Sequence, residues 1–326
     1  MNRHLVTALV CSLLLAGCGG TAGSVTEQSV TFMAGYSPQA NLPFVGVYVA
    51  EAKGYFEEVG LDVAIEHSGG GGEHLQLLAA GEVDVTTQDA AVLLERRADP
   101  GLPLVSIALT GQVGQQAYVA LADSGMETPA DWVGQTVGFK GTPAPDMYGL
   151  MDEFGVGESQ IDLVNVGFDP RVLTEGSVDV YPVFKSNEPD LLRRLGFDVT
   201  MWDPAAYGIP TLGLTFVATE SAIAEEPEAL RSFVTASMRG LLYAEQNRDE
   251  AIDIVLTHTG EEADPDHQRF ILDTEFEDFR SDVTNDHQPG WQTTQQWQAL
   301  ADELLRYEVL TEPIDIDNAF TNELLD

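Results

Sequence analysis

From Val30 onward, short apolar runs alternate with segments whose apolar residues recur at helical spacing. The runs "VTFMAGY" and "LDVAIEH" predict strands, and "LPFVGVYVAEAKGYF" between them predicts a helix with Phe44, Tyr48 and Ala52 on one face. The alternation continues through the helices "EHLQLLAAG" and "DAAVLLERR" and the strands "VDVTT" and "LPLVSIAL". Strands and helices that alternate with short connections favour an open α/β sheet flanked by helices.

A second series of the same kind begins at "AYVALA", residues 117–122. Its predicted strands are "TVGFKG", "IDLVNVG", "VDVYPVF" and "DVTMWD", and a helix is expected from Asp146 to Phe154. The apolar run "TLGLTFVAT", residues 211–219, predicts a long strand before mostly helical sequence from Pro227 to the end. We therefore expect two α/β lobes, formed by residues 30–115 plus 217–326 and by residues 116–216, with two extended connections as a hinge.

One sequence motif occurs in both predicted lobes. "AAGEVDVTTQDAAVLLERR", residues 79–97, is echoed by "LTEGSVDVYPVFKSNEPDLLRR", residues 173–194. In each copy a short strand is followed by polar residues and a helix. Because ligands of open α/β sheets bind beyond the carboxyl ends of the strands, we expect Gln88 and Asp89 to face Asn187 and Glu188 across one cleft.

Composition excludes several classes of function. The 326 residues, 44% of them hydrophobic, suffice for two domains, and 53 acidic against 15 basic side chains give a net charge of −38. This charge excludes nucleic acid as a partner. No cysteine follows Cys18, which excludes disulfides and thiolate sites. The remaining histidines are scattered without metal-binding or catalytic spacing, so we expect no metal, no cofactor and no enzymatic activity. We also expect a monomer.

The first residues have the pattern of an export signal. Arg3 and His4 precede an apolar run, and "LAGC" ends at Cys18, which predicts a signal peptide over residues 1–17. The run is shorter than the roughly 20 residues of a membrane-spanning helix. The "LAGC" ending resembles the bacterial lipoprotein box, which implies lipidation of Cys18 and anchorage on the extracytoplasmic face of the cell membrane. An ordinary secretory signal is the alternative. Residues 18–29, rich in Gly, Ser and Thr, are expected to be a flexible tether.

Four phrases carry a family resemblance: Tyr36, Pro38 and Asn41 in "Y-x-P-x-x-N", then "YVAEAKGYFEEVGLDV", "LLAAGEVDV" and "SGMETPADWVGQTVGFKG". Together they resemble solute-binding proteins of bacterial ABC importers, in the branch that binds pyrimidine precursors of thiamine and has relatives for riboflavin and sulfonates. The resemblance covers residues 30–220. It implies a periplasmic-binding-protein type II fold, whose two lobes close around a solute, and an importer permease as partner. The alternative from another class is a pyrimidine-synthase-like enzyme, whose cysteine-rich iron motif this chain lacks.

Candidate ligand contacts in the first lobe follow its strands or lie at the hinge. They are Tyr36, Pro38, Asn41, Gln88, Asp89, Gln112 and Gln115. Several have an equally simple structural role: Asn41 is placed to cap the helix that begins at Leu42, Asp89 in a first helical turn would favour the helix dipole, and the glutamines could satisfy hinge backbone. The resemblance implies that aromatic residues such as Tyr36 stack on a heterocycle. The glycine run 69–72 lacks the Lys-Ser/Thr ending of a phosphate loop.

Candidate contacts in the second lobe are Lys140, Thr142, Tyr181, Asn187 and Glu188. Lys140 is one of only three lysines in the chain. The resemblance implies that a carboxylate of this lobe pairs with an aminopyrimidine, and Glu188 matches by position. Tyr181 is either an aromatic wall or a core residue. A thiamine pyrimidine precursor is the leading ligand, followed by a flavin and then a sulfonate-like anion, which the scarcity of basic residues disfavours.

Overall fold

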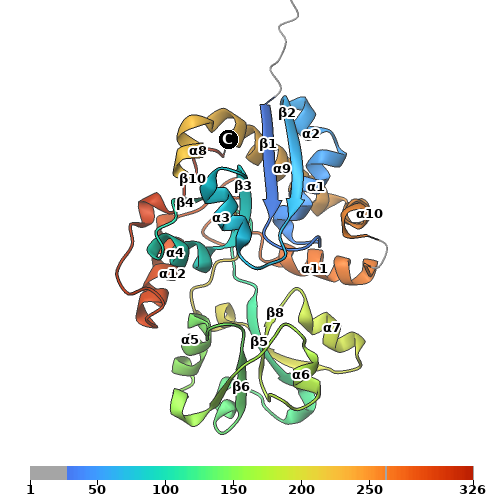
Figure 1. Cartoon of the computed structure of the whole chain (residues 1–326). Helices are drawn as coiled ribbons and strands as arrows, with labels where there is room; N and C mark the ends of the chain where they lie inside the picture. Colours follow the sequence, from blue (N-terminus) through green and yellow to red (C-terminus); the bar gives the residue numbers. More distant parts are fainter. Residues whose placement is uncertain (1–27, 261–262, 326) are drawn as a thin grey trace, which may run out of the picture.

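The computed structural model describes residues 28–260 and 263–325, which form two lobes joined by a narrow waist (Figure 1). The predicted signal peptide, Cys18 and most of the predicted tether lie outside these residues. The prediction of a tether up to residue 29 was wrong at its end. Gln28 and Ser29 are the first residues of strand β1 and pair with Leu61 and Asp62, because sheet pairing satisfies their backbone groups.

The first lobe is built on a five-stranded mixed sheet in the order β2-β1-β3-β10-β4, with β10 antiparallel to both neighbours. Its strands are β1 (Gln28–Ala34), β2 (Leu61–His67), β3 (Val85–Asp89), β4 (Leu104–Leu109) and β10 (Leu214–Thr219). Its helices are α1 (Leu42–Ala52), α2 (Tyr55–Glu58), α3 (Glu73–Ala80), α4 (Ala90–Ala98), α8 (Glu220–Glu225), α9 (Pro227–Gln246), α10 (Arg248–Thr259), α11 (Pro265–Glu277), α12 (Thr294–Arg306) and the 3-10 helix η5 (Ile316–Asn318).

The second lobe has the sheets β8-β5-β9 and β6-β7, which are linked by a bridge between Val137 and Val180. Its strands are β5 (Gln116–Leu121), β6 (Thr136–Phe139), β7 (Asp162–Asn165), β8 (Tyr181–Phe184) and β9 (Val199–Trp202). Its helices are α5 (Pro145–Glu153), α6 (Arg171–Thr174), α7 (Glu188–Arg194) and the 3-10 helices η1 (Ala122–Ser124), η2 (Pro129–Trp132), η3 (Glu158–Gln160) and η4 (Pro204–Tyr207).

Two predicted elements differ from the structure. The helix predicted through residue 56 breaks into α1 and α2 at Gly54, whose φ of 71° ends the helical path. The last strand begins at Leu214, where pairing with Asp89 starts, so residues 214–216 lie in the sheet of the first lobe, ahead of the boundary expected at residue 217.

Aromatic side chains fill the core of each lobe. In the first lobe, Phe32 of β1 lies 5.9 Å from Phe216 of β10 and 5.6 Å from Phe233 of α9, measured between ring centroids. In the second lobe, Trp132 packs edge-on against Trp202 at 5.6 Å. Both tryptophans are fully buried. Each lobe therefore has its own hydrophobic core. Among the described residues, no helix combines the length and apolar character needed to cross a membrane.

The hinge consists of two chain segments in close contact, one after β4 and one before β10. The Gly111 N–H donates to Leu214 O at 2.9 Å, and the Gly213 N–H donates to Gly111 O at 2.8 Å. A Cβ on Gly213 would lie 2.8 Å from Val113 O and 3.2 Å from the Gly111 Cα. Only glycine allows the two segments to approach this closely.

Replacing Gly213 by alanine should lower the free energy of unfolding by about 1–3 kcal/mol, since the added methyl meets backbone that cannot rotate away. Urea unfolding followed by circular dichroism measures the change. Gly167→Ala is the matched control, because a Cβ there has no heavy atom within 4 Å. Equal stability of the two variants would contradict the close-contact explanation.

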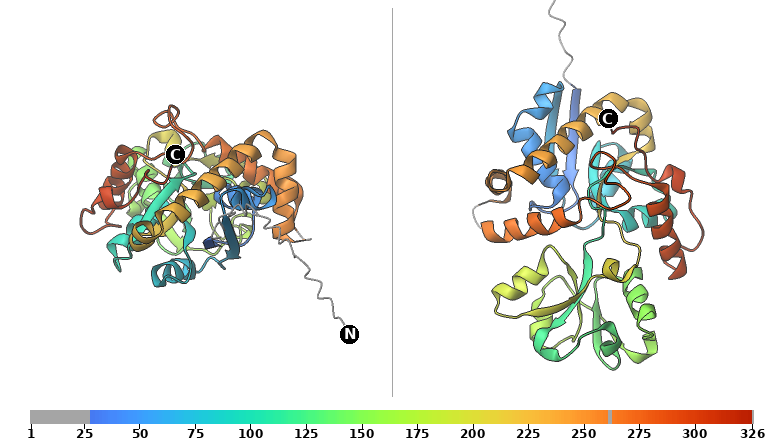
Figure 2. Two further views of the ribbon diagram at one scale, coloured as in Figure 1. Left: turned by 90° about the horizontal axis from the view of Figure 1, so that it is seen from above. Right: turned by 180° about the vertical axis from the view of Figure 1, so that it is seen from behind.

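Besides the hinge, the lobes touch at two places on opposite sides of the waist (Figures 1 and 2). On one side α12 meets α5, where Arg306 Nη2 lies 3.1 Å from Asp152 Oδ2 and the Tyr307 hydroxyl donates to the same oxygen at 2.9 Å. On the other side α11 meets α7. The region between the α12–α5 contact and the α11–α7 contact is therefore lined by residues of both lobes.

Candidate functional site

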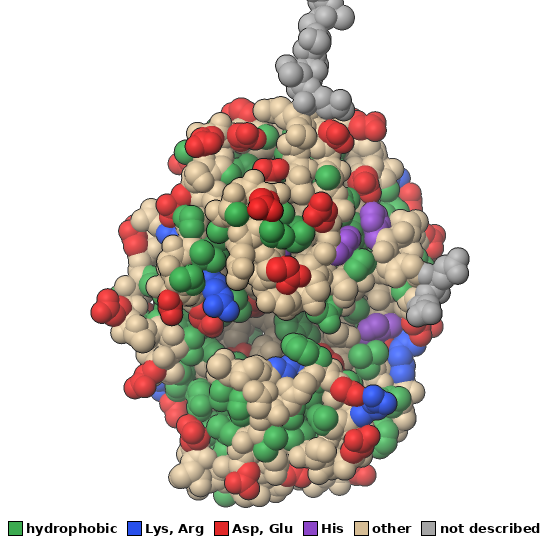
Figure 3. All heavy atoms as spheres, in the orientation of Figure 1, with side chains coloured by type: hydrophobic (Ala, Val, Ile, Leu, Met, Phe, Trp, Pro, Cys, Tyr) green, Lys and Arg blue, Asp and Glu red, His purple; other side chains and the backbone are tan. Residues whose placement is uncertain are grey.

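The molecular surface is hollowed between the lobes, with apolar and basic side chains at the rim of the second lobe (Figure 3). On this lobe the structure brings together three of the predicted residues. Lys140 Nζ lies 2.6 Å from Glu188 Oε1 and 5.0 Å from the centroid of the Tyr181 ring. The Phe168 ring is 5.2 Å from the same nitrogen and is 75% exposed. An ion pair thus lies between a buried and an exposed aromatic ring.

Glu188 is held in place by the turn that begins α7. Its Oε2 accepts from the Phe184 N–H at 2.8 Å, and Pro189 follows it in the first helical turn, where proline is well tolerated. The side chain is only 5% exposed. Lys140 follows β6, and Tyr181 lies in β8 with its hydroxyl donating to Gly167 O at 2.9 Å. The end of β6 and the start of α7 therefore place one donor, Lys140, beside one acceptor, Glu188.

Tyr36 lies in the loop after β1 and is 42% exposed. Its ring packs over the glycine run, since a Cβ on Gly70 would lie 2.7 Å from the ring edge. Gly70 also has φ of 84°, so glycine suits the position for two reasons. The Glu73 carboxylate accepts from the Gly69 N–H at 2.8 Å, so the protein's own carboxylate uses a donor of this loop. Pro38 is half-buried in the loop that carries Tyr36.

Asp89 was expected in the first turn of α4 but lies one position earlier. It is the N-cap, and its Oδ1 accepts from the Ala91 N–H at 2.9 Å. Desolvation, together with the nearby Asp146 carboxyl of the second lobe, raises the pKa of Asp89 to about 7. Burial likewise raises the pKa of Asp146 to about 6, although the Tyr118 hydroxyl donates to it at 2.7 Å. Two acids from opposite lobes are thus close enough to interact.

The Gln88 side chain makes two contacts. Its Oε1 accepts from the Asp89 N–H at 2.8 Å, and its amide Nε2 lies 3.3 Å from the Nε2 of His74. Asn187 is bonded to His267 rather than to Gln88 or Asp89. Among the described residues no contact joins Gln88 or Asp89 to Asn187 or Glu188, so the expectation that these pairs face each other stays a prediction.

Asn41 was predicted as a helix cap or a ligand contact. It occupies the N-cap position of α1, but its side chain does not cap the helix. The Glu275 carboxylate of α11 does so instead, accepting from the Leu42 N–H at 2.7 Å and from the Asn41 amide. Ser186 of the second lobe also donates to Glu275, at 3.3 Å. Burial raises the pKa of Glu275 to about 7. One carboxylate thus ties the start of α1 to the opposite lobe.

The two hinge glutamines differ in what they contact. Gln112 is fully occupied: its amide nitrogen donates to Leu109 O and Trp291 O, and its oxygen accepts from three side chains of the first lobe. Gln115 donates to Asp278 at 2.7 Å, while its Oε1 is buried with no hydrogen-bond partner among the described residues. Gln115 therefore retains an acceptor that a ligand donor could use.

The remaining predicted residue, Thr142, is exposed in the loop between β6 and α5. Near the hinge, Lys185 Nζ lies 2.7 Å from Asp203 and 2.8 Å from Asp278, so this lysine is occupied by two carboxylates of opposite lobes. No cluster of three or more potential metal ligands occurs within residues 28–260 and 263–325.

The sequence interpretation missed Phe168, Glu275 and Asp278. Phe168 follows β7 and could have been found by the same rule of strand ends that selected Lys140. Glu275 could have been found from the helical pattern, because it is an acidic residue between Leu272 and Phe276 on the buried face of α11. An acid on an apolar helix face indicates a specific partner.

The amino-acid sequence is similar to a known family and to two named binding proteins. The profile of the family described as NMT1/THI5 like matches residues 41–251. The formylaminopyrimidine-binding protein of Halalkalibacterium halodurans is 29% identical, over 98% of both chains. The riboflavin-binding protein RibY of Chloroflexus aurantiacus is 30% identical over 92% of this chain and 87% of its own. These relatives are binding proteins, in agreement with the solute-binding class expected from the sequence.

Among solved structures, the periplasmic aliphatic sulphonate binding protein SsuA of Escherichia coli superposes with a TM-score of 0.69 at 13% identity, over 89% of this chain and 91% of its own. At this identity the match concerns the fold alone. It confirms the predicted two-lobed α/β fold of periplasmic binding proteins.

Proposed function

Because the chain belongs to the NMT1/THI5-like family, we propose that it is the extracytoplasmic solute-binding protein of an ABC importer and that its solute is a small heterocycle with an aminopyrimidine edge. The Lys140–Glu188 pair carries this proposal. An aminopyrimidine presents an amino donor beside a ring-nitrogen acceptor. Glu188 offers the matching acceptor and Lys140 the matching donor, 2.6 Å apart.

The surrounding residues favour a flat, uncharged solute. Tyr181 and Phe168 flank the ion pair. Tyr181 is fully buried, so Phe168 is the ring that can stack on a heterocycle. Glu188 already neutralises Lys140, so this pair offers no uncompensated positive charge to a sulfonate. The names of the two sequence relatives, which refer to a formylaminopyrimidine and to riboflavin, support the same class. Riboflavin is the second candidate, because its ring system also has a pyrimidine edge.

The site we propose comprises Tyr36, Asp89, Gln115, Lys140, Tyr181 and Glu188 from the predicted set, together with Phe168 and Asp146. Delivery to a permease in the same membrane follows from the importer role. The "LAGC" ending at Cys18 supports a lipid anchor.

Mass spectrometry of the compound that co-purifies with the protein tests the ligand class. Isothermal titration with an aminopyrimidine, riboflavin and an alkanesulfonate should then show one site per chain and the tightest binding for the aminopyrimidine. Tightest binding of the alkanesulfonate would refute the proposed class.

Replacing Phe168 by alanine should weaken binding of the aminopyrimidine about tenfold, since a stacking contact is lost. Unfolding stability should be unchanged, because the ring is mostly exposed. Titration calorimetry measures the affinity. Phe197→Ala removes another partly exposed ring of the same lobe and should leave affinity unchanged. A tenfold loss in both variants would speak against a stacking role.

A further inference from the structure

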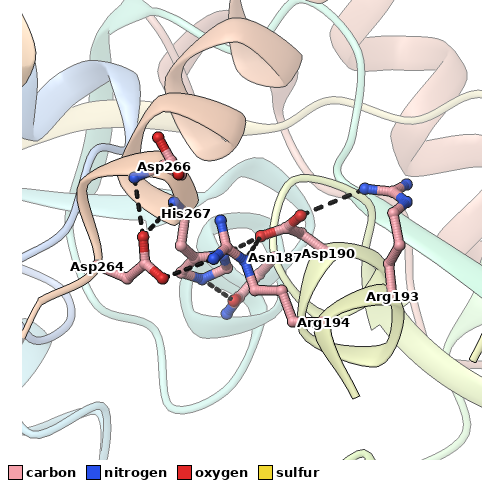
Figure 4. Close-up of polar contacts among 7 residues, drawn as sticks. All are labelled: Asn187, Asp190, Arg193, Arg194, Asp264, Asp266 and His267. Atoms are coloured by element: carbon pink, nitrogen blue, oxygen red, sulfur yellow. Dashed lines mark hydrogen bonds and ion pairs between the residues drawn. The ribbon is translucent and has the colours of Figure 1, made fainter. Parts of the chain in front are cut away.

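Helix α11 of the first lobe holds the start of α7, the helix that carries Glu188. His267 Nδ1 lies 2.9 Å from Asp190 Oδ2, and His267 Nε2 lies 3.0 Å from Asn187 Oδ1 (Figure 4). Ser186, just before these residues, donates to Glu275 near the other end of α11. Helix α11 thus contacts residues just before and just after Glu188 in the sequence, but not Glu188 itself.

Both partners of His267 are hydrogen-bond acceptors. Nδ1 faces the Asp190 carboxylate and Nε2 faces the Asn187 side-chain amide, so the imidazole links α11 to residues on both sides of Glu188. The charged groups around it are Asp190, Arg193 and Arg194 on α7 and Asp264 and Asp266 at the start of α11. Arg194 Nε lies 2.5 Å from Asp190 Oδ2 within α7, and Arg194 Nη1 lies 2.5 Å from Asp264 Oδ2 of the first lobe. The second ion pair adds to the contact between the lobes.

These groups are shielded from solvent to different degrees. The side chains of His267 and Asp190 are 13% and 9% exposed, whereas those of Arg194 and Asp264 are more open. Buried, charge-assisted hydrogen bonds are screened little by salt and contribute more than exposed pairs. The His267 contact is therefore the strongest part of the cluster.

We propose that His267 is a positioning residue for solute capture: it fixes the start of α7, and with it Glu188, when the lobes meet, and it slows reopening without touching the solute. The capture part of this inference rests on the proposed function. The closure part does not, because the contact joins the lobes directly. A contact made only with the lobes together stabilises that arrangement and lowers the rate of release.

The test compares His267→Ala, His267→Gln and, as a matched control, Arg269→Ala. Arg269 lies on the same helix, but its ion pair with Asp249 stays within the first lobe. Stopped-flow measurement with an aminopyrimidine probe should show release about tenfold faster in His267→Ala. The affinity ratio between the aminopyrimidine and riboflavin should not change. Glutamine, whose amide NH2 can still donate to Asp190 or Asn187, should restore part of the slow release.

A further readout separates positioning from a general loss of structure. Small-angle scattering without solute should give a larger radius of gyration for His267→Ala than for Arg269→Ala.

Equal release rates and equal radii in all variants would overturn the proposal, as would the same changes in Arg269→Ala. If no probe binds, the proposed ligand class fails, and the scattering result alone then decides whether His267 joins the lobes: equal radii refute it, and a larger radius in His267→Ala supports it.

Discussion

Replacing Glu188 by glutamine should weaken aminopyrimidine binding about a hundredfold. The substitution removes a buried acceptor charge and leaves Lys140 without its partner, and lost hydrogen bonds to charged groups cost about 1.5–3 kcal/mol each. The carboxylate is only 5% exposed, so water replaces it poorly. Titration calorimetry at neutral pH measures the effect, and Asp179→Asn, which removes an exposed carboxylate of the same lobe, should bind as the parent does.

A double variant decides between two explanations of that loss. If Glu188 serves only to neutralise Lys140, then Lys140→Met combined with Glu188→Gln should recover most of the affinity. If Glu188 itself accepts the amino group of the solute, the double variant should bind no better than Glu188→Gln. Recovery in the double variant would therefore remove the direct contact from the proposed site.

The free energy of unfolding should rise as the pH is lowered from about 8 to about 5. Burial raises the pKa of Glu275 and of Asp89 to about 7 and that of Asp146 to about 6. These acids therefore bind protons in the folded protein at pH values where the unfolded chain, with ordinary pKa values near 4, does not. Their stabilising effect is complete below the unfolded pKa and is lost as the pH rises through the folded pKa.

Urea unfolding of the parent and of Glu275→Gln, repeated across this pH range, isolates one of the three groups. The difference in unfolding free energy between the two proteins should change by about 1–3 kcal/mol between pH 5 and pH 8. Relief of repulsion among the many surface acids acts on both proteins alike and cancels. A pH-independent difference would show that burial does not shift the Glu275 pKa.

Local patterns sufficed for the architecture. The alternation of strand and helix predicted two α/β lobes, which the fold confirms, because the hydrophobic period is a property of short segments. The strand-end rule selected Lys140 and Glu188, which the structure joins in an ion pair, and their role as ligand contacts stays a prediction.

The roles of Asn41, Asp89 and the C-terminal helices required the folded chain. Asn41 is not a cap, because Glu275, far along the sequence, supplies the carboxylate that the start of α1 needs. His267 and Asp278 meet the second lobe only because the chain returns to the first lobe at β10. By itself the sequence determined the class of molecule and the strand ends where a solute could bind. Only the tertiary structure decided which acids are desolvated and which side chains join the lobes, since burial and long-range pairing depend on neighbours that no local pattern specifies.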